Sequence, residues 1–339
     1  MNTTIHKFTL FFTACLLTCS VQAQRGPQDT WYETGNVALP ANCDPYDLIV
    51  TPEGTLLLSD YGNDKIHEFE ANGTLIRSFG SLGSGNGQFN NPTELAIGSS
   101  NRIYVTDRNN HRIQILERNG TFNKAFGTNG NSDGNFDEPY GLAISSLDEV
   151  FIVDKNNNRI QVFDSNGTFL RKWGALGNLD GKFNIPVGAD FTNKGELMIV
   201  DNNNNRLVFF DSQGNFIRKF SLYRHYDFWR SSHFVSYLKS GLVFVGGGND
   251  GPGQGRNYAN IYELNGDLVK RWTLGGDNFP LCAQLSDGNL LVVDRVSKTI
   301  IFYTQTYRSL RSNSSKDAPL PEVISVTQLA GTNHLEVKY

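Results

Sequence analysis

The sequence predicts an all-β protein, a six-bladed β-propeller. Three observations support this: a proline that recurs every 47 residues, short apolar runs rich in β-branched residues, and Asn-Gly pairs between those runs. The prolines on this period are Pro45, Pro92, Pro139, Pro186 and Pro280, with His233 where the sixth would stand. One such unit cannot bury both faces of its own sheet, so we expect six units to pack around a common axis.

Each unit is predicted to be a four-stranded antiparallel meander. In the second unit, residues 103–105 and 113–116 form the middle strands, and Asn119-Gly120 is the turn before the outer strand. Asn-Gly suits a type I′ hairpin because both central residues need positive φ. Equivalent pairs are Asn72-Gly73, Asn166-Gly167 and Asn265-Gly266.

Composition and charge exclude several classes of protein. The 339 residues carry a formal net charge of −4, which offers no positive excess for phosphate backbones, so nucleic acid is not an expected partner. The chain has no Gly-x-Ser-x-Gly, His-Glu-x-x-His or Walker-type phosphate motif. We therefore assign no catalytic residue and no cofactor from motifs.

The N-terminus, residues 1–23, is predicted to be a signal peptide. Lys7 precedes an apolar run over residues 8–17, and Val21-Gln22-Ala23 fits the small-x-small rule for cleavage. The run is too short to span a bilayer, so we expect no membrane insertion. The protein is therefore expected to be secreted, periplasmic or on the cell surface, with lipidation at Cys19 as a less favoured alternative.

The propeller is predicted over residues 24–304, and its ring closure follows from both chain ends. Trp31 stands where an outer-strand aromatic is expected, so the N-terminal strand should complete the last blade; residues 305–311 compete for that place. Closure would make Cys43 and Cys282 neighbours, and an exported protein permits a disulfide between them. The alternative is two buried thiols.

Residues 305–319 have the composition of a linker, and residues 320–339 contain two alternating strands, 323–326 and 334–337. Two strands alone are marginally stable. They are similar to the start of an immunoglobulin-like domain, so we expect either a fragment of a longer protein or a hairpin that packs on the propeller.

The repeat resembles the NHL repeat. The similar segments are Pro139-Tyr140-Gly141-Leu142-Ala143, residues 153–163 and Asn166-Gly167. The resemblance extends over about residues 30–303, closely in units two to four and least in unit five. It implies an NHL-type six-bladed propeller, and such propellers serve as scaffolds, ligand binders and occasionally enzymes.

Repeated polar residues are predicted to hold the turns and neighbouring blades together. Each of four units has an Asp at the end of its second strand, an Asn three residues later and a Lys or Arg five residues later. Short polar side chains accept hydrogen bonds from backbone N–H groups in tight turns. The Asp residues are Asp60, Asp107, Asp154 and Asp201.

Unit five departs from the repeat, and we predict a ligand site there. Residues 221–230 are dense in aromatic and basic groups, and a longer loop over residues 246–256 replaces the turn Asp. Rings offer stacking area, and Arg and His donate to a carboxylate, sulfate or sugar acid. The alternative is that large side chains only fill a gap. The candidate residues are Tyr223, Arg224, His225, Tyr226, Trp229, Arg230, His233 and Arg256.

Three carboxylates are predicted near the axis. Asp47 and Glu94 follow their prolines by two residues, and Asp190 lies two residues further along its strand. Neighbouring carboxylates favour protonation or a cation, and oxygen ligands suit Ca²⁺. Asp47 and Glu94 are therefore candidate Ca²⁺ ligands, although solvated channel acids are the preferred interpretation.

The predicted function is an exported, non-catalytic binding or scaffold propeller that recognises an extracellular peptide, glycan or protein near blade five. The alternative comes from resemblance: peptidyl-hydroxyglycine lyases use an NHL-like propeller with a histidine-held zinc at its centre. Only His233 starts an inner strand here, and His225 could reach the same face. Two histidines fall short of a three-His site.

Overall fold

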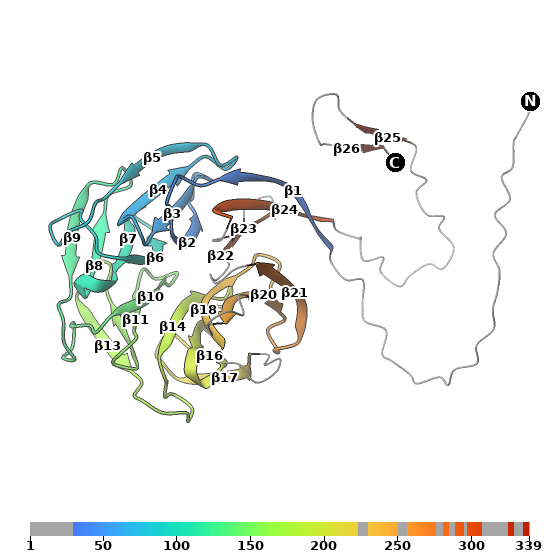
Figure 1. The fold of residues 1–339 in the computed structure, drawn as a ribbon. Coiled ribbons are helices and arrows are strands. Elements are labelled where there is room, and N and C mark those ends of the chain that lie inside the picture. The colour runs from blue at the N-terminus through green and yellow to red at the C-terminus, as the bar shows by residue number, and fades with distance from the viewer. Residues whose placement is uncertain are drawn as a thin grey trace, which may run out of the picture.

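The structure, a computed structural model, describes residues 30–222, 230–249, 256–275, 281–284, 289–294, 297–306, 325–328 and 335–338. Within these residues it is almost entirely β-structure, with two short 3-10 helices, η1 (Arg108–Asn110) and η2 (Asn202–Asn204). Six four-stranded antiparallel sheets stand around a common axis (Figure 1). The prediction of a six-bladed β-propeller is confirmed.

The first four blades each use four consecutive strands, with the first strand nearest the axis. Blade one comprises β2 (Pro45–Val50), β3 (Leu56–Asp60), β4 (Lys65–Phe69) and β5 (Leu75–Phe79), and blade two comprises β6 (Pro92–Ile97), β7 (Ile103–Asp107), β8 (Arg112–Leu116) and β9 (Phe122–Phe126). Blade three comprises β10 (Pro139–Ile144), β11 (Val150–Asp154), β12 (Arg159–Phe163) and β13 (Phe169–Trp173), and blade four comprises β14 (Pro186–Phe191), β15 (Leu197–Asp201), β16 (Arg206–Phe210) and β17 (Phe216–Ser221).

The N-terminal strand closes the ring, as the sequence predicts. Blade five comprises β18 (Arg230–Tyr237), β19 (Val243–Asn249), β20 (Arg256–Tyr262) and β21 (Leu268–Gly275). Blade six joins β22 (Leu281–Gln284), β23 (Leu290–Asp294) and β24 (Thr299–Thr306) from the C-terminal repeat to β1 (Thr30–Ala38). β1 pairs antiparallel with β24 from Thr30 opposite Thr306 to Ala38 opposite Thr299.

Burial follows from the stacking of blades. Every residue of the second strands β7, β11 and β15 is buried, because a neighbouring blade covers each face of the sheet. The outer strand β17 instead alternates between partly and fully exposed residues, which is the pattern of a sheet with one solvated face. The apolar core therefore lies between blades, so no single blade is expected to be stable alone.

The connectors into blades two, three and four are anchored by a buried phenylalanine. Phe89, Phe136 and Phe183 are fully buried, and each connector begins with a glycine at positive φ. At Gly127, φ is +97° and an added Cβ would lie 2.4 Å from the Phe136 ring. Glycine is required there by both conformation and space.

Blade five differs from the prediction in one respect. Gly246 to Asn249, expected to begin a loop, belong to β19 and pair with β18, and Gly246 and Gly247 also pair with β20. β19 is therefore longer than β7, β11 and β15, because the glycines and the asparagine continue its pairing with β18. Residues 250–255 lie outside the described residues.

The C-terminal segment contains one antiparallel pair, β25 (Ser325–Gln328) and β26 (Leu335–Lys338). An immunoglobulin-like domain stays a prediction, and the predicted signal peptide lies outside the described residues. No helix in the described ranges is long and apolar enough to cross a membrane.

Candidate functional site

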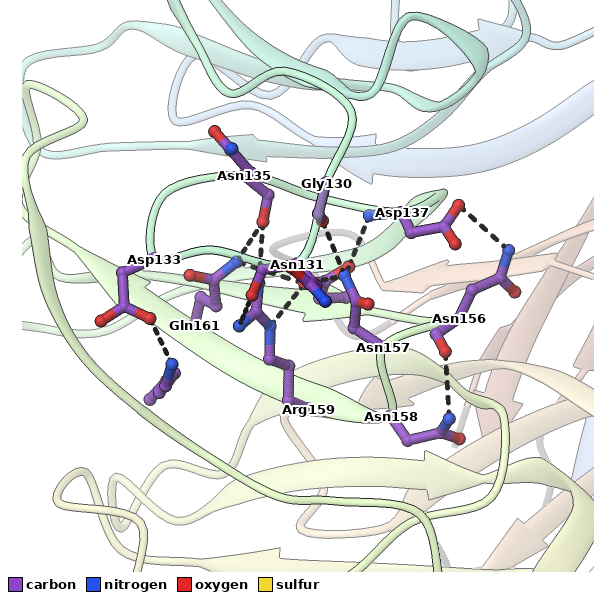
Figure 2. Close-up of polar contacts among 12 residues, drawn as sticks. Gly130, Asn131, Asp133, Asn135, Asp137, Asn156, Asn157, Asn158, Arg159 and Gln161 are labelled. Carbon is purple, nitrogen blue, oxygen red and sulfur yellow. Dashed lines mark hydrogen bonds and ion pairs between the residues drawn. The ribbon is translucent and has the colours of Figure 1, made fainter.

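The repeated Asp residues hold the turns and the connectors, as predicted. In blade three, Asp154 accepts hydrogen bonds from Asp137 N at 2.8 Å and Arg159 Nε at 2.7 Å. Arg159 also donates to the connector carbonyls of Asn131 and Asn135 (Figure 2). Asp154 is fully buried. The hydrogen bonds of this network occupy its carboxylate, so Asp154 is not available as a catalytic acid.

The face of the ring where these Asp residues end their strands is called here the Asp-turn face. The connectors between blades run on the same face, since Leu222 N donates to Asn205 O of the turn after β15. The opposite face carries the turns between first and second strands, such as Thr51 to Gly54. These two faces present different chemistry at the axis.

A cavity of about 620 Å³ lies on the axis, and all six inner strands contribute to its lining. Its lining continues to residues 51–54, so the cavity opens on the opposite face. Asp47, Glu94 and Asp190 line it, which confirms that these carboxylates come together at the axis.

The axial carboxylates bridge neighbouring blades. Asp47 Oδ2 accepts a hydrogen bond from Leu95 N at 2.8 Å, and Glu94 Oε2 accepts one from Leu142 N at 2.7 Å. Asp190 Oδ2 accepts one from Tyr237 N at 2.6 Å. Each acid therefore receives an inner-strand N–H of the next blade, and the three do not form a cluster of metal ligands within the described chain.

Burial changes the ionisation of these acids. Desolvation raises the pKa of Asp47 to about 7 and that of Asp190 to about 6, against the opposing effect of their backbone hydrogen bonds. Desolvation, followed by the negative charge of Asp47, raises the pKa of Glu94 well above its ordinary value. Near neutral pH the cavity therefore holds protons as well as negative charge.

These shifts predict that stability falls as the pH rises from about 5 to 7. Over this range the folded protein binds protons at Asp47 and Asp190 that the unfolded chain has lost, so each bound proton contributes a slope of up to about −1.4 kcal/mol per pH unit. Chemical denaturation of wild type and Asp47→Asn across this range checks it, and the variant should show a shallower decline. The exposed pair member Asp133 provides the control, because Asp133→Asn should leave the slope unchanged. An equal slope in wild type and Asp47→Asn would refute the assignment.

Two tyrosines pack across the axis at the other end. Tyr46 of β2 and Tyr140 of β10 have ring centroids 5.5 Å apart in an edge-on arrangement, and both are buried. They precede the first cavity-lining residue of their strands. They therefore separate the cavity from the Asp-turn face.

A group of aromatic and charged residues, which includes Tyr140 itself, lies at this end of the axis on the Asp-turn face. We call Tyr61, Arg108, Glu138, Tyr140 and Lys155 the axial cluster. The Arg108 guanidinium lies 5.9 Å from the Tyr61 ring centroid and 5.4 Å from that of Tyr140, and Lys155 Nζ lies 5.5 Å from that of Tyr140. Two cations thus share one aromatic platform.

Glu138 joins the two cations. Its Oε2 accepts hydrogen bonds from Arg108 Nη2 at 2.7 Å and from Lys155 Nζ at 2.9 Å. Partial burial opposes ionisation, but the hydrogen bonds from Lys155 and Arg108 outweigh it and lower the pKa of Glu138 to about 2. The cluster therefore keeps one net positive charge at neutral pH, and its cations are each about 18% exposed.

Sequence reasoning missed this cluster. Tyr61, Arg108 and Lys155 each directly follow a repeated Asp, in blades one, two and three. The sequence does contain a signal for the cluster, because the residue after each repeated Asp begins the turn that faces the axis in these blades. The residue type at this position differs from blade to blade, so the spacing of the repeat did not point to it.

The predicted blade-five residues are placed only in part. Arg230 and His233 lie in β18 and Arg256 begins β20. β18 starts three residues before His233, so that histidine is inside the strand rather than at its start. Tyr223, Arg224, His225, Tyr226 and Trp229 lie outside the described residues. The described ends of that segment, Leu222 and Arg230, belong to the Asp-turn face.

The predicted disulfide is not present in the structure. Cys43 and Cys282 are both buried free thiols. They have different surroundings: Cys282 lines the axial cavity, whereas the Cys43 thiol interacts with Asp60 in blade one. Closing the ring thus places both in the same apolar core, where each remains a free thiol.

Comparison with known families identifies the repeat. Residues 89–116 and 136–163 match the NHL repeat, and each match runs from a buried connector phenylalanine to the end of a third strand. The protein is a six-bladed β-propeller that contains NHL repeats. This confirms the resemblance stated from the sequence, on two of the three blades that follow it closely.

Solved structures share the fold of this NHL-repeat propeller. A streptogramin B lyase is similar with a TM-score of 0.57 and 14% identity, over 82% of this chain and 98% of that one. A catalytically inactive histidine-to-alanine variant of virginiamycin B lyase from Staphylococcus aureus with quinupristin has a TM-score of 0.57 and 15% identity, over 84% and 90%. A protein of unknown function from Bacteroides caccae has a TM-score of 0.54 and 10% identity, over 73% and 94%. No curated protein matches the chain.

Proposed function

We propose that this NHL-repeat propeller is an exported, non-catalytic binding protein that recognises a carboxylate- or sulfate-bearing peptide or glycan, free or on a protein, at its Asp-turn face. The axial cluster is the observation that supports this most directly. Arg108 and Lys155 are partly exposed, stand over tyrosine rings and together outnumber the single acid between them.

The N–H donors of Arg108 and Lys155 suit an anionic ligand. Arginine has five N–H donors and lysine three. Glu138 accepts one from each cation and the Tyr61 hydroxyl accepts one from Arg108 at 3.2 Å. In the described part of the chain, four of these eight donors remain for a ligand when the buried Arg108 Nε is left out, and the tyrosines supply flat area for a sugar or peptide group.

Blade five extends the same face. Its strand β19 runs seven residues against five for β7, β11 and β15, and its second half carries three glycines, Gly246 to Gly248. Glycine within a strand often marks a close approach of a ligand or another backbone. A ligand that spans from the axial cluster to blade five would reach the predicted residues Arg230 and Arg256.

A lyase-like metal enzyme is the alternative raised by the sequence, and the structural neighbours include lyases. Similarity at 14–15% identity carries the fold alone. Among the described residues that line the axial cavity, none is a histidine. No observation favours this alternative over binding.

The test is ligand capture by the full chain. An array of acidic peptides, uronic-acid glycans and sulfated glycans is read by thermal shift, and each hit is measured by calorimetry. Arg108→Ala and Lys155→Ala should each weaken binding of an acidic hit by about tenfold or more, which corresponds to about 1.4 kcal/mol. Lys172→Ala, an exposed outer-strand cation, should bind as wild type does.

Two outcomes would reject the proposal. One is binding of hits that is equal in wild type and in both cluster variants when all retain the wild-type melting temperature. The other is binding of neutral and acidic hits with equal affinity. Trp229→Ala and Arg230→Ala then show whether blade five takes part, since lost capture with intact folding supports a contact and a large drop in melting temperature supports a packing role.

A further inference from the structure

Blade one builds its Asp network from different residues than the other blades. In blades two, three and four the turn Asp accepts a hydrogen bond from an arginine Nε at 2.7 Å; these arginines are Arg112, Arg159 and Arg206. Blade one has Lys65 at this position, and its side chain is exposed. His67 supplies the contact instead, with Nε2 3.0 Å from Asp60 Oδ2. His67 stands where blades two and three have Gln114 and Gln161, which donate to the Asp at 3.0 and 3.2 Å.

A second substitution falls at the same point. In blades two to four, the buried phenylalanine of the connector comes just before the backbone N–H that donates to the turn Asp. In blade one that N–H belongs to Asp44, at 2.9 Å from Asp60 Oδ1, so Cys43 takes the place of the phenylalanine. Cys43 is fully buried, and its thiol donates a hydrogen bond to Asp60.

The two changes bring three metal-binding groups together. Possible ligand atoms of Cys43, Asp60 and His67 lie within 4.8 Å of one another, and the three residues are 0%, 0% and 4% exposed. Thiolate, imidazole and carboxylate are the ligands that Zn²⁺ accepts in proteins. We propose that Cys43, Asp60 and His67 bind a zinc ion in blade one.

The local geometry needs a small movement of Asp60 and His67, and a movement of the Cys43 thiol of up to about 1.5 Å from the 4.8 Å limit. With Zn–S of about 2.3 Å and Zn–N or Zn–O of about 2.0 to 2.2 Å, tetrahedral ligands stand roughly 3.3 to 3.7 Å apart. Asp60 and His67 would therefore separate by a few tenths of an ångström from their 3.0 Å contact. Three protein ligands leave the fourth position for a small ligand such as water.

Neighbouring groups orient the three ligand residues both with and without zinc. Ser78 Oγ lies 2.7 Å from His67 Nδ1. A hydroxyl both donates and accepts, so Ser78 pairs with Nδ1 when Nε2–H faces Asp60, and also when Nδ1–H is formed and Nε2 binds zinc. Asp60 is also held by Asn63 Nδ2, which donates to Oδ2 at 2.8 Å, and by Asp44 N, which donates to Oδ1 at 2.9 Å. Binding releases the thiol proton to solvent, and the +2 ion is balanced by thiolate and carboxylate.

Zinc at this site would stabilise the closed ring. Cys43 lies between β1, which completes blade six, and β2, which begins blade one. Leu39 N in this connector donates to Lys298 O of blade six at 2.7 Å, and the Asp60 and His67 ligands belong to blade one. Zinc would tie the closing connector to the first blade, at the place where other blades use an aromatic side chain.

The test uses the full chain purified with a reductant, stripped with a chelator and then incubated with ZnCl₂ alone. We expect about one zinc per chain after desalting, and a melting temperature raised by at least about 4 °C relative to the stripped protein. Co²⁺ in place of zinc should give a thiolate-to-cobalt charge-transfer band. His67→Gln installs the residue of Gln114 and Gln161, so it should fold and keep the Asp60 contact but lose zinc and the melting shift.

Cys43→Ser should remove the charge-transfer band and lower zinc content at least tenfold. The proposal is overturned if the wild type holds no zinc, if His67→Gln and Cys43→Ser retain it, or if mass spectrometry without reductant shows Cys43 joined to Cys282. These readouts report zinc binding and do not require a ligand at the axial cluster, so they stand apart from the test of ligand binding.

Discussion

Replacing Arg159 by alanine is expected to lower the free energy of unfolding by about 3 to 5 kcal/mol. Arg159 Nε pairs with Asp154 at 2.7 Å, and both residues are buried. Its Nη atoms also donate to Asn131 O, Ser132 O and Asn135 O of the connector from blade two. Removing the guanidinium leaves a buried carboxylate and three carbonyl acceptors without this donor. Chemical denaturation of wild type and variant measures the loss.

Lys172→Ala is the matched control in the same blade. Lys172 pairs with Asp133, and both side chains are more than 40% exposed. An exposed pair of this kind contributes about 0 to 1 kcal/mol. A loss of less than about 1 kcal/mol in Arg159→Ala would show that the Asp network is not what holds blades two and three together.

Gly141→Ala should destabilise the ring by about 3 kcal/mol or more, because the inner strands of blades three and four lie in close contact. An added Cβ at Gly141 would stand 2.2 Å from the Val187 carbonyl oxygen and 2.6 Å from Val153 Cγ2. The first of these is backbone of the next blade, so relief requires β10 and β14 to separate. A thermal melt and a denaturant titration report the effect.

Gly35→Ala is the control for this substitution. An added Cβ at Gly35 meets nothing within 4 Å, and its φ lies outside the left-handed region. Its effect should stay within about 0.5 kcal/mol. If both variants unfold at the wild-type denaturant concentration, the axial packing is looser than described.

The repeat itself made most of the fold predictable. Proline spacing located the inner strands, and Asp60, Asp107, Asp154 and Asp201 end second strands as expected. Ring closure was also predictable, because a single strand before the first inner strand has a partner only in the last blade. These predictions succeeded because each depends on local turn chemistry and on nearest-neighbour contacts, which a periodic sequence states several times.

The site was less accessible to sequence reasoning. Asp47 and Glu94 were placed at the axis correctly, but their roles as acceptors of backbone N–H groups from the next blade depend on how inner strands stagger. Tyr61, Arg108 and Lys155 come from three different units, and their meeting around Tyr46 and Tyr140 depends on the angle between blades. Blade five was recognised as irregular, yet the last four residues of β19 were taken for part of a loop.

By itself, the sequence determined the number of blades, the residues at their turns and the strand that closes the circle, since each repeat encodes its own hairpins and its own buried face. Only the tertiary structure decided which side chains meet where blades converge: the axial cluster on one face, the carboxylates in the cavity, and Cys43 with Asp60 and His67 rather than with Cys282. The reason is physical, because distances between blades arise from the packing of all six sheets at once.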